Sequence, residues 1–197
     1  IYKIMSGIVA RFAPSPTGFL HIGGIRTALI NYILVQQSKL KNPESKFFLR
    51  IEDTDKVRSK NEYKESIING LEWLGLKWDG EVLIQSERAK RHKEVAYELL
   101  EKGYAFKCIC TTEELESKRL RNQKKHLSVK RLCTKCENNS KVQKLDKNYC
   151  IRIKIPNDGQ LSITDVIQEK VTIKNKELDN FILLRKNGTP TYMLSVV

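Results

Sequence analysis

The segment that most constrains the fold of this chain covers residues 7–34 and combines a strand, a tight turn and the start of a helix. The apolar run from Gly7 to Ala13 predicts a buried strand, which Pro14 and Pro16 must end because proline cannot donate to a strand ladder. From about His21 onward, apolar residues recur at helical spacing. Strand, turn and helix in this order are typical of an α/β nucleotide fold.

Glycines and polar side chains surround the turn. Gly18, Gly23 and Gly24 let a ligand approach the backbone, and the last two lie near the predicted helix N-terminus, where free N–H groups attract anions. A structural turn has no use for the cation, two hydroxyls and imidazole supplied by Arg11, Ser15, Thr17 and His21. The segment predicts a nucleotide phosphate site that suits a triphosphate, and a well-capped structural turn is the alternative interpretation.

A second apolar segment, residues 47–55, predicts a strand that ends in three carboxylates. The carboxyl ends of strands are where open α/β sheets bind their ligands. The alternative is that these acidic residues only end the strand beside Arg50 and Arg58.

These motifs resemble those of the class I aminoacyl-tRNA synthetases. The HIGH motif of that class is matched by residues 21–24, His-Ile-Gly-Gly. Residues 13–18, Ala-Pro-Ser-Pro-Thr-Gly, and residues 50–55, Arg-Ile-Glu-Asp-Thr-Asp, are similar to the glutamyl-tRNA synthetase group. Residues 75–80 and 85–88 agree with the same group, so the resemblance covers most of the chain. It implies a Rossmann-like α/β catalytic domain that ligates glutamate to the 3′ end of tRNA(Glu) through a glutamyl-adenylate.

The resemblance also implies roles for individual residues. The implied glutamate-binding residues are Arg11, Ala13, Ser15, Glu52 and Tyr192, and the implied ATP-binding residues are Thr17, Gly18, His21, Gly23 and Gly24. Arg11 can bind a substrate carboxylate bidentately, and Glu52 can receive the substrate α-ammonium. His21 is the implied catalytic residue and donates to a phosphate oxygen, while Mg²⁺ offsets the charge of the triphosphate. Positioning is the main task, because both acceptors are substrate oxygens.

The pattern changes after residue 103. Helices are predicted near residues 60–74 and 87–102, whereas the following stretch has cysteines, a basic helix at 112–125 and short strands at 150–155, 161–167 and 171–173. We expect residues 1–105 to form the first half of the catalytic domain, 106–179 an inserted α+β connective domain, and 180–197 the start of the second half. The resemblance implies that the insertion binds the acceptor stem of tRNA.

The insertion carries two short cysteine pairs, Cys108-x-Cys110 and Cys133-x₂-Cys136. Four thiolates satisfy tetrahedral Zn²⁺, and a small polar insertion needs such a staple because it lacks apolar mass. Ordinary reduced cysteines are the alternative, and disulfides are not expected in a cytoplasmic protein. Members of the family match the first pair but vary at the second, so the resemblance leaves the ligand set open. Cys150 begins a strand and is expected to be a packing residue.

The net charge of +13, from 36 Lys and Arg against 23 Asp and Glu, favours a polyanionic partner. The basic residues of 118–135 either follow a phosphate backbone or form a solvated helix face. No apolar run approaches the roughly 20 residues that span a bilayer, and no secretory signal is present. We expect a cytoplasmic monomer without a membrane partner, whose ligands are tRNA(Glu), L-glutamate and ATP.

The family's second ATP motif and its anticodon-binding part have no counterpart here, so we expect an N-terminal fragment of a longer enzyme that is inactive alone in complete aminoacylation. The alternatives are a glutamyl-queuosine tRNA(Asp) synthetase paralogue and a non-catalytic, zinc-stapled RNA-binding module. Glutaminyl-tRNA synthetase is disfavoured by the pattern between Ser15 and His21. Selection between tRNA(Glu) and tRNA(Gln) depends on parts that read the anticodon, which the sequence does not contain.

Overall fold

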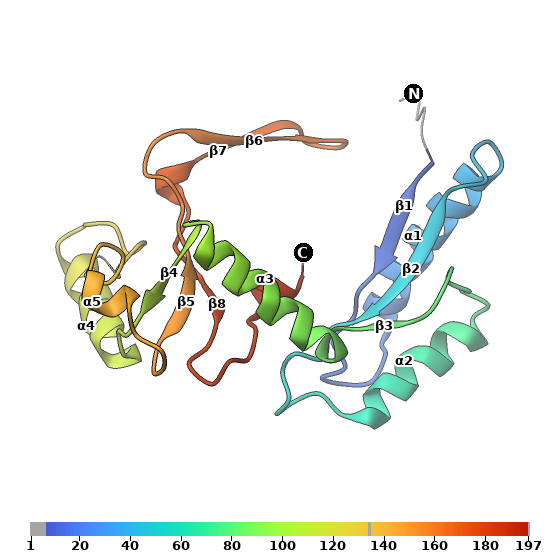
Figure 1. The fold of residues 1–197 in the computed structure, drawn as a ribbon. Helices are drawn as coiled ribbons and strands as arrows, with labels where there is room; N and C mark the ends of the chain where they lie inside the picture. The colour runs from blue at the N-terminus through green and yellow to red at the C-terminus, as the bar shows by residue number, and fades with distance from the viewer. Residues whose placement is uncertain (1–6, 134, 197) are drawn as a thin grey trace. The chain divides into compact units, whose positions relative to one another are not determined.

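The computed structural model describes residues 7–133 and 135–196 of the 197-residue chain. The chain divides after Arg88 into two compact units. The first contains a parallel sheet with helices, and the second is built on an antiparallel sheet (Figure 1).

The first unit is a Rossmann-like α/β arrangement. Its sheet has the order β1-β2-β3 with both pairs parallel, where β1 is Val9–Phe12, β2 is Lys46–Ile51 and β3 is Leu83–Ile84. A parallel pair needs a crossover connection, which helix α1 (Ile22–Lys39) supplies between β1 and β2. Helix α2 (Asn61–Trp73) and the short 3₁₀ helix η1 (Gln85–Arg88) complete the unit. The predicted strand, turn, helix and second strand are confirmed within a few residues.

The core of this unit forms on one face of β2. Phe47, Leu49 and Ile51 alternate along the strand and are fully buried, as the period-2 pattern of a strand requires. They belong to one apolar cluster with Val35 of α1 and Leu71 of α2. Both helices therefore contribute to the core beneath the sheet.

The second unit begins with helix α3 (Ala89–Glu101) and contains the sheet β4-β5-β8, with both pairs antiparallel. Its strands are β4 (Ala105–Cys108), β5 (Cys150–Ile153) and β8 (Ile182–Leu184). Two further strands, β6 (Gln160–Asp165) and β7 (Glu169–Lys174), form a separate hairpin, followed by the 3₁₀ helix η2 (Asn175–Glu177). The remaining helices are α4 (Thr112–Lys124), α5 (Ser140–Gln143) and α6 (Tyr192–Ser195).

Most elements of the second unit match the predicted ones, but β4 was not predicted. This strand is four residues long, and its pairing with β5 joins segments about 45 positions apart, so no local pattern reveals it. The chain segment 181–185, which the sequence analysis assigns to the second half of the catalytic domain, contributes β8 to the same sheet. The three-part domain division itself stays a prediction.

Among the helices of residues 7–133 and 135–196, none has the length and apolarity that crossing a bilayer requires.

Asp79 fastens the start of β2 to the end of α1. Its carboxylate accepts hydrogen bonds from the Phe47 backbone N–H at 2.8 Å and from the Lys39 ammonium at 3.0 Å to each oxygen. Burial opposes ionisation of this carboxyl, but the two donors outweigh burial and lower its pKa.

We expect Asp79→Asn to lower the free energy of unfolding at pH 7 by about 1–2 kcal/mol, because the ammonium and the N–H lose a charged acceptor. A lowered pKa in the folded state means that the stabilisation is complete above the unfolded value of 3.8 and is lost as the pH falls through the folded pKa. Urea titrations of both proteins should therefore show a gap in stability that closes below about pH 4. The exposed Glu81→Gln is the control, and a gap that persists in acid would contradict this account.

Candidate functional site

His21 caps helix α1 with its own side chain. Its Nδ1 atom accepts a hydrogen bond from the Gly23 backbone N–H at 3.2 Å. In a neutral imidazole the proton then lies on Nε2, so this exposed ring presents a donor to ligands. The predicted helix start is confirmed. The capping role was missed because Ser, Thr, Asp and Asn, rather than His, are the usual N-cap residues.

The glycines beside His21 are explained by close approach. A Cβ atom on Gly23 would lie 2.9 Å from the His21 ring carbon Cε1, so the capping ring itself requires glycine there. A Cβ on Gly18 would meet nothing within 4 Å, which leaves room beside the turn. The first turn of α1 contains no acidic residue, so the positive end of the helix dipole stays available to an anion.

Two backbone hydrogen bonds join the turn to the end of β2. The Glu52 N–H donates to the Pro14 carbonyl at 2.9 Å, and the Lys60 N–H donates to the Pro16 carbonyl at 3.2 Å. The turn with the predicted phosphate site and the strand end with Glu52 therefore lie together at the carboxyl edge of the parallel sheet. Around it, Ala13 is half-buried, and four side chains are exposed, those of Arg11, Ser15, Thr17 and His21.

Each of the three carboxylates at the end of β2 has a partner within the first unit. Arg50 and Glu52 are both buried, and the guanidinium donates twice to Glu52 Oε1, at 2.7 and 3.2 Å. Asp53 accepts hydrogen bonds from the backbone N–H and the hydroxyl of Ser86, at 2.8 and 2.6 Å.

The third carboxylate, Asp55, accepts a hydrogen bond from Arg58 Nε at 2.7 Å, and this bond lowers the pKa of the Asp55 carboxyl. The contacts with Arg50 and Arg58 are those of the alternative interpretation. They give the acidic residues a structural role, whether or not Glu52 also binds a ligand.

Tyr192 is the remaining residue of the predicted glutamate site. It is the first residue of α6, in the second unit, and is about half exposed. Its membership of a site with Arg11 and Glu52 stays a prediction.

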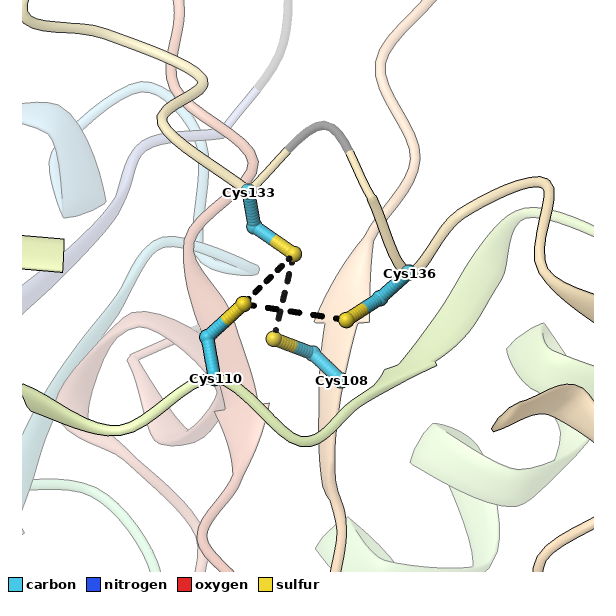
Figure 2. Close-up of side chains that lie close together, drawn as sticks. All are labelled: Cys108, Cys110, Cys133 and Cys136. Atoms are coloured by element: carbon cyan, nitrogen blue, oxygen red, sulfur yellow. Dashed lines mark hydrogen bonds between the residues drawn. The ribbon is translucent and has the colours of Figure 1, made fainter. Parts of the chain in front are cut away.

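The four predicted cysteine ligands converge on one point in the second unit. Figure 2 shows the sulfur atoms of Cys108 and Cys110, at and just after the end of β4, facing those of Cys133 and Cys136. All four side chains are buried and their sulfurs lie within 4.8 Å of one another, with hydrogen-bonded pairs at 3.2, 3.5 and 3.7 Å. Four sulfurs bound to one zinc ion at about 2.3 Å would lie about 3.8 Å apart. The cluster has the composition and the spacing of a metal site.

The thiols of this cluster influence one another's ionisation. The hydrogen bond from Cys133 strongly lowers the pKa of Cys108 and raises the pKa of Cys133. Burial raises the pKa of Cys110 to about 11. One anionic sulfur surrounded by protonated ones is a site that a divalent cation completes by displacing protons.

Cys150 lies beside the cluster but outside it. It pairs with Cys108 across β4 and β5 and is 5% exposed in the same core. Its predicted packing role is confirmed.

Gln143 fixes the loop that carries the second cysteine pair. Its side-chain amide donates to the Cys136 carbonyl at 2.7 Å and to the Lys107 carbonyl at 3.0 Å, and it accepts from the Lys107 N–H at 2.9 Å. The loop is thereby held against β4. No sequence signal identified this residue, because a glutamine on a short helix has no distinctive pattern.

The basic run of residues 118–135 is divided by the structure. The Arg131 guanidinium donates to the backbone carbonyls of residues 155, 156, 175 and 178, and Lys135 pairs with Glu114 at 2.7 Å. These two residues hold the unit together. By contrast, a depression of about 330 Å³ on α4 is lined by Ser117, Leu120, Arg121, Lys124 and Lys125, and its three cations have no acidic partner among the described residues.

Comparison with known proteins was made once for sequence families. Residues 7–197 match the family model described as tRNA synthetases class I (E and Q), catalytic domain.

Individual relatives agree with the family match. The glutamate–tRNA ligase 2 of Zymomonas mobilis is 48% identical over 190 residues, which are 96% of this chain and 38% of that protein. The glutamate–tRNA ligase 2 of Rickettsia felis is 45% identical over 98% of this chain and 41% of its own length. A crystal structure of a glutamate tRNA ligase from Elizabethkingia meningosepticum, in complex with its amino acid, aligns with a TM-score of 0.77 at 30% identity, over 97% of this chain and 41% of that one. The chain thus spans about two fifths of the length of these relatives.

The buried Arg50–Glu52 pair can be tested by a double-mutant cycle. We expect Arg50→Met to lower the free energy of unfolding by about 3 kcal/mol, because it leaves the Glu52 carboxylate buried without its cation. The double variant Arg50→Met/Glu52→Gln should recover at least half of that loss. Chemical denaturation followed by tryptophan fluorescence measures both, and purely additive effects would show that the two side chains are not coupled.

Proposed function

The chain belongs to the tRNA synthetases of class I (E and Q), and from this membership we propose that it takes part in the ATP-dependent ligation of glutamate to the 3′ end of tRNA(Glu). The structural observation that carries the proposal is the open N-terminus of α1, where His21 caps the helix through Nδ1 and presents Nε2. The identities of 45 and 48% with glutamate–tRNA ligases favour glutamate as the amino acid.

ATP is proposed to bind along the turn and the first residues of α1. Its phosphates would lie near Thr17, Gly18, Gly23 and Gly24, where the helix dipole and the lack of bulky side chains favour an anion. His21 Nε2 would donate a hydrogen bond to a phosphate oxygen, and this donor counts most as charge develops in the transition state. Mg²⁺, when bound with ATP, would offset the charge of the triphosphate.

Glutamate is proposed to bind beside the phosphates. Arg11 would bind one substrate carboxylate, with Ala13 and Ser15 beside it. Glu52, which Arg50 holds through Oε1, would receive the α-ammonium. Tyr192 is proposed to close the far side. The α-carboxylate would then attack the α-phosphorus with loss of pyrophosphate, and a terminal ribose hydroxyl of tRNA would displace AMP from the adenylate.

The second unit is proposed to contain the connective domain that holds the acceptor stem of tRNA. The support is the basic surface formed by Arg121, Lys124 and Lys125, which carries no compensating acids among the described residues. We further propose that the four clustered cysteines bind a structural Zn²⁺, and that the protein acts as a monomer in the cytoplasm.

The function is tested by ATP–pyrophosphate exchange with glutamate, using the natural protein that contains this chain, with and without tRNA. We expect exchange that requires tRNA. His21→Ala should lower the exchange rate by about a hundredfold, as expected for the loss of one transition-state donor, and should also destabilise α1.

His21→Asn separates the two roles of this residue. Asparagine is a good N-cap, so the variant should keep its thermal stability and still lose the rate. A normal rate in His21→Asn would contradict the catalytic role. Exchange without tRNA would indicate the queuosine-modifying paralogue, and no exchange in either condition would leave a non-catalytic RNA-binding module.

The metal proposal has its own test. We expect the purified chain to contain one zinc ion, measured by inductively coupled plasma mass spectrometry, and to unfold at a lower temperature after chelation. Cys133→Ser should abolish zinc retention, whereas Cys150→Ser, which changes a buried cysteine outside the cluster, should retain it. Equal zinc contents in these two variants would refute the four-cysteine assignment.

A further inference from the structure

The second unit has a basic concavity that no step of the proposed reaction uses. Its volume is about 270 Å³, and it is bounded by helix α3, the turn before β5 and the turn after β8. The side chains that line it include four cations, those of Lys93, Lys147, Arg185 and Lys186. Only one carboxylate, that of Asp146, lies among the lining residues.

The lysines of this concavity lack internal counterions. No described carboxylate lies within 4.0 Å of the ammonium groups of Lys93, Lys147 and Lys186. Arg185 uses one guanidinium nitrogen to bind the Pro190 carbonyl at 2.7 Å. Like charges gathered around one hollow repel each other, and a bound anion removes that cost.

Two tyrosine hydroxyls add neutral hydrogen-bonding groups to the wall. Tyr97 and Tyr149 approach each other at 3.5 Å between their hydroxyl oxygens. The Lys107 ammonium lies 4.7 Å from the centre of the Tyr149 ring and fixes that ring from outside the concavity. Burial raises the pKa of Tyr149 to about 12, so its hydroxyl remains a donor at neutral pH.

The backbone holds these groups in place. Asn148 and Gly188 both adopt left-handed conformations, with φ of 65° and 75°, in the two turns that carry Lys147 and Lys186. The Asn187 side chain further accepts hydrogen bonds from the Thr189 N–H and hydroxyl, at 3.1 and 2.7 Å. The two turns therefore present their lysines from defined backbone positions.

We propose that this concavity is a binding site for a phosphate-bearing anion. A volume of 270 Å³ is below the usual range for drug-sized ligands and suits a single phosphate or diphosphate group. Ammonium and guanidinium groups with hydroxyl donors are the chemistry that recognises phosphate oxygens. The group can come from a free anion or from the backbone of a nucleic acid. The site stands apart from the N-terminus of α1 and does not rest on the proposed function.

The experiment uses isothermal titration calorimetry on this chain with two probes, inorganic pyrophosphate and a short RNA duplex, at fixed salt concentration. The test variant is Lys147→Ala/Lys186→Ala. The matched control is Lys170→Ala/Lys174→Ala, which removes the same charge from the exposed hairpin strand β7. We expect the test variant to bind roughly tenfold more weakly and the control to change less than about twofold.

The two probes distinguish the sources of the phosphate. Weaker pyrophosphate binding in the test variant alone supports a free-anion site, and weaker RNA binding alone supports a nucleic-acid contact. Pyrophosphate held at α1 would be lost in His21→Ala but kept in the test variant. Equal binding by the test and control variants, or no binding of either probe, would overturn the proposal. Lys186→Gln, with thermal unfolding as a fold check, replaces the double variant if that variant does not fold.

Discussion

The candidate active site depends on the parallel pairing of β1 with β2 and on its continuation into the turn that follows β1. Proline cannot donate a hydrogen bond, and for that reason Pro14 and Pro16 end the strand. Their carbonyls nevertheless accept from the Glu52 and Lys60 N–H groups. The same residues that break the ladder as donors therefore anchor the turn as acceptors, and they hold the turn against the end of β2 without further strand structure.

Charge pairing at the end of β2 shows how a ligand site can be built from structural interactions. Arg50 neutralises Glu52 in a buried environment, where an unpaired carboxylate would be costly. Both hydrogen bonds go to one oxygen of that carboxylate. The pair thus fixes the orientation of Glu52 before any ligand arrives. Such preorganisation is what a site needs in order to spend binding energy on the ligand instead of on ordering itself.

Local pattern was sufficient for the parts of the fold that form locally. The strand, turn and helix from Gly7 to Lys39, and the spacing of the four cysteines, could be predicted because each signal lies within a short segment. The rest depends on contacts between distant residues. The capping by His21, the clamp made by Gln143 and the carbonyl contacts of Arg131 follow from side-chain geometry, which composition and periodicity do not encode.

Arg131 shows why a run of basic residues is a poor guide to a binding surface. Sequence pattern alone treats it like its neighbours, yet its guanidinium ties the cysteine loop to the base of the β6–β7 hairpin, through carbonyls that no other side chain reaches in that list of bonds. A guanidinium has several donors in a fixed plane and suits a cluster of carbonyls, whereas a lysine has a single ammonium. Only the cations without such contacts are available to a polyanion.

The core around the cysteines explains why the second unit would depend on a metal. Five buried cysteines form most of one apolar cluster, with Phe106 and Val142. Helix α4 contributes no buried residue, and every residue of β6 is exposed. Thiols bury little apolar area, so this cluster offers less hydrophobic stabilisation than the core beneath β2. Four bonds from sulfur to one ion would supply the missing free energy and would hold β4 and the loop after α4 at a fixed separation.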